Sequence, residues 1–183
     1  MVFTATNAAT GNGVADTPGN PNQRHNPQHG LNAEPSRFLE DHFMTSAVLQ
    51  VRIPPRHCDS QGMMHAARPY EYFEDAFLAW LDRECGGYES LRAGGDDFVI
   101  VQSQCRYIAP ARLGDRIDLS VRPVSVGKRS SFTVEVEMAR DGQVLARCSV
   151  TYVTVRDGRS APVPGSLRQA MQANVLQRPE LGR

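Results

Sequence analysis

A short polar loop holds the carboxylate that is best placed for chemistry in this sequence. Asp59 is followed three residues later by Gly62, and a long amphipathic pattern begins soon afterwards. A helix N-terminus offers unpaired backbone N–H donors and the positive end of the helix dipole. Those donors can hold an oxyanion that develops on a carbonyl group, while the carboxylate attacks the carbonyl carbon or activates water. The spacing therefore predicts a site for carbonyl chemistry, with the two roles of Asp59 left open.

A second carboxylate, Glu74, lies between Phe73 and Phe77 in the amphipathic pattern. A carboxylate inside an apolar stripe needs a hydrogen-bonding partner or must bind a proton. Glu74 is therefore the second choice for the catalytic carboxylate, and a structural, hydrogen-bonded glutamate is the alternative. Gly62 is expected to allow the left-handed or tight backbone that aims the helix start.

The other side chains of the loop offer weaker hypotheses. A cysteine beside a histidine, as in His57-Cys58, suggests a nucleophile, but neighbours on extended backbone point apart. His65 is a candidate to line the pocket or to hydrogen-bond the substrate. The Met63-Met64 pair suits either an aromatic ring or an adaptable aliphatic pocket.

The composition narrows the class of protein. A chain of 183 residues is expected to form one domain with a substantial core. Twenty basic and twenty acidic residues balance, which argues against nucleic acid or an anionic membrane as the main partner. The four cysteines form no C-x-x-C pair and no run of apolar residues approaches the length of a membrane span. We expect a cytoplasmic protein with no metal and no organic cofactor.

The chain divides into three parts by composition and hydrophobic pattern. Residues 1–42 are rich in Asn, Gly and Pro and are predicted to be a disordered tail. Residues 43–164 alternate between apolar and polar patterns and are predicted to form the domain. Residues 165–183 are predicted to be a C-terminal tail with a short capped helix near residues 166–171.

The elements that must position the loop follow in a simple order. A strand near residues 46–53 precedes the loop, and a helix over residues 66–85 follows it. The apolar face of that helix is predicted to hold Tyr70, Phe73, Phe77, Trp80, Leu81 and Glu84. Four strands joined by tight turns come next, with a strong hairpin signal at Asp141-Gly142. The fold class is therefore α+β, an antiparallel sheet with one face on a single helix, and a dimer that extends the sheet would cover its edge.

Three stretches resemble the hotdog-fold acyl-CoA thioester hydrolases of the 4-hydroxybenzoyl-CoA thioesterase type. The first is the Asp-x-x-Gly loop of Asp59 and Gly62, which runs into an aromatic helix. The second is the Pro-Ala-x-x-Gly-Asp turn at residues 110–115, and the third is the closing strand with Gly158 and Pro162-Val-Pro164. The similarity covers about residues 46–164. It implies a five-stranded antiparallel sheet wrapped around one long central helix.

The resemblance also implies roles for individual residues. Asp59 corresponds to the catalytic carboxylate, and the backbone N–H of Ala66 would polarise the thioester carbonyl. The ligand would lie at a dimer interface, with Met63, Met64, His65 and Tyr70 near the acyl group. The CoA phosphates would rest on surface basic residues, for which Lys128 and Arg129 on a predicted hairpin are the candidates. The sequence departs from the family at His65, Ala66 and Pro69, where the family has tyrosines or small polar residues, and its Tyr70 falls one position late.

The expected activity is hydrolysis of an acyl- or aroyl-CoA thioester, or of a thioester on a carrier protein, to a free acid and a thiol. Two alternatives stay open. One is a hotdog hydratase or dehydratase, which needs a histidine with an acidic partner over the acyl chain. The other is a non-catalytic module that binds acyl thioesters and in which Asp59 is a structural cap.

Overall fold

The structure is a computed structural model that describes residues 47–176. The predicted tail at residues 1–42 lies outside the described residues, as do the last seven positions of the chain, 177–183. None of the helices within residues 47–176 is long and apolar enough to cross a membrane.

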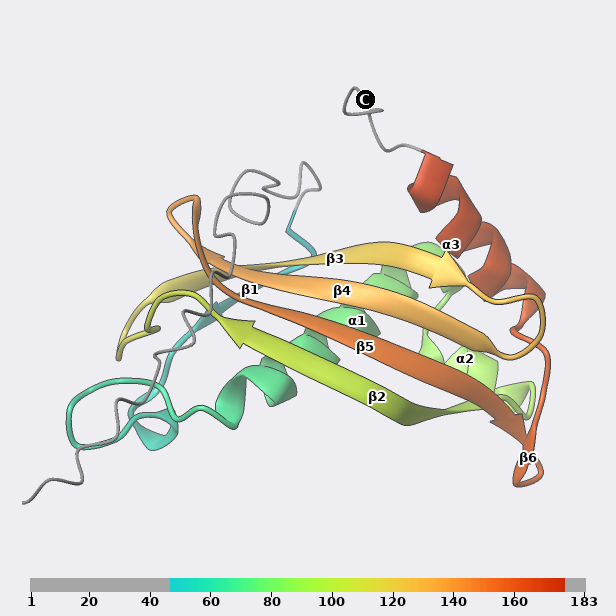
Figure 1. The fold of residues 1–183 in the computed structure, drawn as a ribbon, viewed down its shortest axis with the longest axis horizontal. Coiled ribbons are helices and arrows are strands. Elements are labelled where there is room, and N and C mark those ends of the chain that lie inside the picture. Colours follow the sequence, from blue (N-terminus) through green and yellow to red (C-terminus); the bar gives the residue numbers. More distant parts are fainter. Residues whose placement is uncertain (1–46, 177–183) are drawn as a thin grey trace, which may run out of the picture. The chain divides into compact units, whose positions relative to one another are not determined.

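An antiparallel sheet forms one layer of the fold (Figure 1). Its strands are β1 (Leu49–Arg52), β2 (Asp97–Tyr107), β3 (Arg116–Val126), β4 (Ser131–Arg140), β5 (Gln143–Arg156) and β6 (Arg159–Ser160). They pair in the order β1-β3-β4-β5-β2, and the two-residue β6 pairs with β5. The predicted α+β class with an antiparallel sheet is confirmed, and β6 is an addition to the five predicted strands.

The turns form where the sequence places its turn residues. Asp141 and Gly142 connect β4 to β5, and both have positive φ angles, 50° and 80°. That conformation matches the twist of a two-residue hairpin, and Asp-Gly adopts it at low cost. The register of β3 against β4 shifts between Pro123 and Ser125, because proline cannot donate to the ladder.

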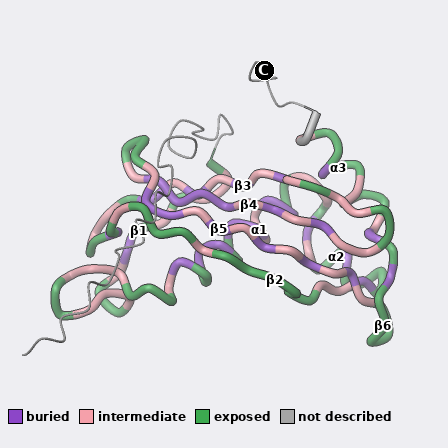
Figure 2. Tube along the Cα trace, viewed as in Figure 1, coloured by how far each residue is buried: buried purple, intermediate pink, exposed green. Residues whose placement is uncertain are grey.

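The long helix α1 (Arg68–Cys85) packs across one face of the sheet (Figures 1 and 2). A 3₁₀ turn, η1 (Pro55–His57), precedes it, and a short helix, α2 (Tyr88–Ala93), follows it. Phe77 stacks on Tyr152 of β5, with their ring centroids 4.8 Å apart. Burying each such aromatic side chain stabilises the fold by about 1.5–3 kcal/mol.

The buried stripe of α1 is rotated from the predicted one. Its buried residues are Pro69, Tyr72, Phe73, Ala76, Phe77, Trp80 and Leu81. Tyr70 is 40% exposed and Glu84 is partly exposed, so neither belongs to the core. The stripe differs because the angle at which the helix crosses the sheet decides which flank is covered.

The C-terminal helix α3 (Gly165–Leu176) is longer than the predicted short helix and packs into the domain. Leu167, Ala170 and Met171 are buried. The guanidinium of Arg168 donates to the carbonyl oxygens of Gly127 and Arg129 at 3.0 and 3.3 Å. The folded unit therefore continues past residue 164.

Candidate active site

Asp59 organises the loop between η1 and α1. Its Oδ1 accepts hydrogen bonds from the amides of Gln61 at 2.8 Å and Met63 at 3.0 Å. The amide of Asp59 donates to the carbonyl of Met63, and the amide of Gly62 donates to the carbonyl of Asp59. Gly62 has a φ of 72°, as its predicted role requires. One carboxylate oxygen thus closes the loop, while Oδ2 has no hydrogen-bond partner among the described residues.

The start of α1 has a free backbone donor. Ala67 is the N-cap residue, and its side chain cannot cap the helix. The amide of Ala66, one residue earlier, donates to no group within residues 47–176. The carbonyl oxygen of Ala66 accepts a hydrogen bond from the Tyr107 hydroxyl at 2.5 Å. This bond ties the loop to the end of β2, and it leaves the amide on the other side of Ala66 available.

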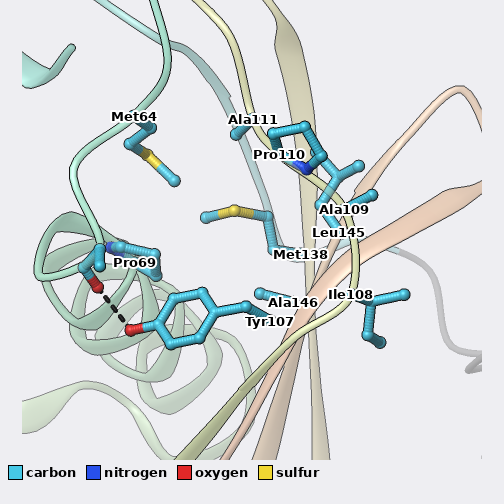
Figure 3. A pocket seen from close by; sticks show the side chains of 11 residues that line it. Met64, Pro69, Tyr107, Ile108, Ala109, Pro110, Ala111, Met138, Leu145 and Ala146 are labelled. Carbon is cyan, nitrogen blue, oxygen red and sulfur yellow. Dashed lines mark hydrogen bonds between the residues drawn. The ribbon is translucent and has the colours of Figure 1, made fainter. Parts of the chain in front are cut away.

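An apolar pocket lies beside Ala66 and Tyr107, and Asp59 is not among the residues that line it (Figure 3). Its volume is about 330 Å³. Its walls come from the start of α1, the end of β2, the loop after β2, and the β4–β5 hairpin. The lining residues are Met64, Ala66, Pro69, Tyr107, Ile108, Ala109, Pro110, Ala111, Met138, Leu145 and Ala146. A free amide on a residue that lines such a pocket can bind a carbonyl oxygen while the pocket holds the attached chain.

The predicted substrate-binding residues separate in the structure. Met64 and Ala66 line the pocket, whereas Met63 instead forms an isolated β-bridge with Arg112. His65 is exposed, and its amide donates to the carbonyl of His57. Tyr70 is exposed and lies edge-on to Phe73.

Glu74 does not lie inside the buried stripe, contrary to the prediction. Its side chain is exposed, because the rotation of α1 places it on the flank of the helix. Burial raises the pKa of Tyr152, and the Glu74 carboxylate adds to that rise. Glu74 thus lies near β5, and it is absent from the pocket lining.

Lys128 and Arg129 lie in the turn between β3 and β4. The pocket is bounded by the far end of β4, at Met138, and by the start of β5, at Leu145. This β4–β5 hairpin lies at the end of the sheet opposite the β3–β4 turn (Figure 1). Within one chain, therefore, the two side chains do not border the pocket. Arg112 is closer, because it follows the lining residue Ala111, is exposed, and has no side-chain partner within the described part of the chain.

The adjacent His57 and Cys58 do not act as a pair. The His57 ring Nδ1 is 2.6 Å from the Tyr72 hydroxyl oxygen. The Cys58 thiol donates to the carbonyl of Pro54 at 3.8 Å. The thiol therefore has no imidazole beside it to act as a base.

Tyr107 is a pocket residue that was not among the predicted site residues, although it closely precedes the Pro-Ala turn at residues 110–115. Burial raises the pKa of the Tyr107 hydroxyl to about 12, and a hydrogen bond to Cys105 adds to the rise. Cys105 lies opposite Cys148 on β5, and a hydrogen bond from Cys148 lowers the pKa of the Cys105 thiol to about 7. The bond from Tyr107 to Ala66 joins residues 41 positions apart, so no local pattern indicates it.

The strand β2 ends the sheet on one side and leaves apolar side chains uncovered. Val99, Ile100 and Val101 are 45%, 58% and 58% exposed. An edge strand with unpaired backbone groups and apolar side chains is a template for pairing with another chain.

Comparison with known proteins agrees with this architecture. The family model described as "Thioesterase superfamily" matches residues 61–154, a stretch that begins two positions after Asp59. A thioesterase from Thermus thermophilus, solved with coenzyme A and Zn, is 29% identical with a TM-score of 0.61, over 74% of this chain and 99% of that one. A 1,4-dihydroxy-2-naphthoyl-CoA thioesterase from Synechocystis is 20% identical with a TM-score of 0.63, over 72% and 97%. A gentisyl-coenzyme A thioesterase is 22% identical with a TM-score of 0.61, over 67% and 98%. The chain therefore belongs to the Thioesterase superfamily and has its hotdog fold.

Proposed function

We propose that this protein hydrolyses an acyl- or aroyl-CoA thioester, or the same thioester on a carrier protein, to a free acid and a thiol. The observation that carries the proposal is the free amide of Ala66, a residue that lines the apolar pocket. Asp59 lies in the loop that leads into Ala66 and has one carboxylate oxygen without a partner in the described chain. Membership of the Thioesterase superfamily supports thioester hydrolysis as the reaction class.

The chemistry can be written with two groups of this chain. The Ala66 amide, aided by the positive end of α1, stabilises negative charge on the carbonyl oxygen. The carboxylate of Asp59 either takes a proton from the attacking water or attacks the carbonyl carbon itself. The C–S bond then breaks, and the leaving thiolate takes up a proton. If Asp59 attacks, water cleaves the resulting anhydride and restores the carboxylate.

No metal or organic cofactor is part of this proposal, because a thioester carbonyl is already electrophilic. We place Arg112, rather than Lys128 or Arg129 of the same chain, nearest to the CoA phosphates. A guanidinium is suited to bind phosphate through two parallel hydrogen bonds. We also propose a cytoplasmic location.

The proposed assembly is a homodimer through β2. A measurement of the mass in solution distinguishes the dimer from a tetramer. The exposed Val99, Ile100 and Val101 support it, because pairing with a second copy would satisfy the backbone of the edge and cover these side chains. The subtype we propose is the 4-hydroxybenzoyl-CoA thioesterase type, in the sense that an aspartate precedes the helix.

The test is release of thiol and free acid from a panel of acyl-CoA and benzoyl-CoA substrates, with both products identified by mass spectrometry. Glu74→Gln is the control variant for the loss of a carboxylate other than that of Asp59, because Glu74 is exposed and does not line the pocket. We expect turnover by the native protein and little change in kcat for Glu74→Gln. A hundredfold loss in that variant would instead make Glu74 the catalytic carboxylate.

One observation favours a second function. The Oδ1 of Asp59 closes its own loop, as a structural cap would. A non-catalytic module would bind acyl-CoA without releasing thiol from any substrate in the panel. A hydratase or dehydratase would change the acyl chain and leave the thioester bond intact.

A further inference from the structure

The walls of the pocket are almost without polar side-chain atoms (Figure 3). Among the eleven residues that line it, Tyr107 alone has an oxygen or nitrogen in its side chain. That hydroxyl already donates to the carbonyl of Ala66. The only polar side chain of the wall is therefore committed to holding the loop.

The backbone groups of the wall are largely occupied as well. The amides of Ile108 and Ala109 donate to the carbonyl of Leu145 at 2.8 and 3.1 Å. The amide of Met64 donates to the carbonyl of Ala111 at 2.9 Å. A polar substituent on the acyl group would find few partners here, since these five residues bond to one another.

The size of the pocket limits the chain that it can hold. Its volume of about 330 Å³ equals roughly ten groups of the size of a water molecule or a methylene, at about 30 Å³ each. Met138 and Ala146 are both lining residues and are buried, at 0% and 3% exposure. The side chains at these positions therefore set the space available to the acyl group.

We infer that the pocket selects acyl groups without polar substituents, up to about ten carbons long, and that Ala146 and Met138 set this limit. The inference rests on the proposed function only in taking the pocket as the acyl site. A hydroxyl group buried without a partner lowers binding, and we expect a factor of about ten to a hundred between a hydroxylated and a plain acyl group. Plain aliphatic and unsubstituted aromatic acyl groups are the favoured classes.

The experiment compares kcat/KM for benzoyl-CoA and 4-hydroxybenzoyl-CoA, and for straight-chain acyl-CoAs of increasing length. Ala146→Leu should fill the pocket and move the optimum to shorter chains, whereas Met138→Ala should move it to longer ones. Ala93→Leu is the control, because Ala93 is an exposed residue at the end of α2. Circular dichroism checks folding, and Met138→Ala keeps the test decisive if Ala146→Leu does not fold.

A second readout separates this inference from the proposed function. Affinities of alkyl-, benzyl- and 4-hydroxybenzyl-CoA thioethers, which cannot be hydrolysed, are measured by calorimetry. If thiol is never released but the thioethers bind in the expected order, hydrolysis fails and the pocket inference stands. If 4-hydroxybenzoyl substrates and 4-hydroxybenzyl ligands equal or surpass the plain ones, or if both pocket variants leave the length preference unchanged, the inference is overturned.

Discussion

Replacing Asp59 by asparagine and by alanine separates the structural role of this carboxylate in the loop from its proposed catalytic role. Its Oδ1 accepts two backbone hydrogen bonds, from Gln61 and Met63. Each such bond contributes about 0.5–1.5 kcal/mol, so Asp59→Ala should lower the free energy of unfolding by about 1–3 kcal/mol. Asp59→Asn keeps an oxygen that can accept both bonds, and we expect it to lose less than about 1 kcal/mol. At roughly 2–4 °C for each kcal/mol, thermal unfolding can resolve the two variants.

Activity should follow a different pattern from stability. Both variants lose the negative charge that activates water or attacks the carbonyl, so kcat should fall by about 10²–10⁴ in each. The assay is thiol release at saturating substrate, beside thermal melts of the same preparations. Intact mass excludes deamidation of the introduced asparagine back to aspartate. If Asp59→Asn keeps kcat within about threefold of the native value, Asp59 is a cap alone and the catalytic reasoning is refuted.

Three further predictions concern the edge, the loop and a thiol. Val101→Lys should weaken self-association at least about tenfold, as measured by light scattering. Leu113→Lys, at a similarly exposed residue off the strand, should not weaken it. Equal effects of the two variants would exclude the β2 edge as the interface. Gly62→Ala and Gly142→Ala should each lower the free energy of unfolding by about 1 kcal/mol, because both residues have positive φ and room for a methyl group. Only Gly62→Ala should also lower kcat, by about tenfold or more. The Cys105 thiol should reach half of its maximal alkylation rate near pH 7, because its lowered pKa makes the thiolate the main form above that pH. Peptide mass spectrometry measures the alkylation rate. A midpoint near pH 9 would contradict the hydrogen bond from the opposing thiol.

The elements of the fold follow closely from local pattern. The two-residue alternation of β3, β4 and β5 and the Asp141-Gly142 turn each act over a few neighbouring residues. Such signals depend on backbone geometry and side-chain spacing, and both can be inferred from sequence. The helix, the strands and their connections were therefore predictable.

The orientation of α1 and the end of the sheet that holds the pocket were harder to predict. Helical spacing identifies an apolar side but not which of its two flanks meets the sheet, and so Glu74 was placed in the stripe although it is exposed. Successive antiparallel strands alternate in direction, so the β3–β4 turn lies at the end of the sheet opposite the β4–β5 hairpin. The pocket forms at the hairpin end, so the turn of Lys128 and Arg129 lies away from it.

The sequence by itself determined that Asp59 and Gly62 form a tight loop before an aromatic helix, because a carboxylate, a glycine with positive φ and a helix start act within about ten residues. The tertiary structure alone decided what faces that loop. Tyr107 reaches the carbonyl of Ala66 from 41 positions away, and Met138 and Ala146 close the pocket from a hairpin farther along. Contacts of this kind depend on strand pairing and on the packing of α1 against the sheet, which no short stretch of sequence specifies.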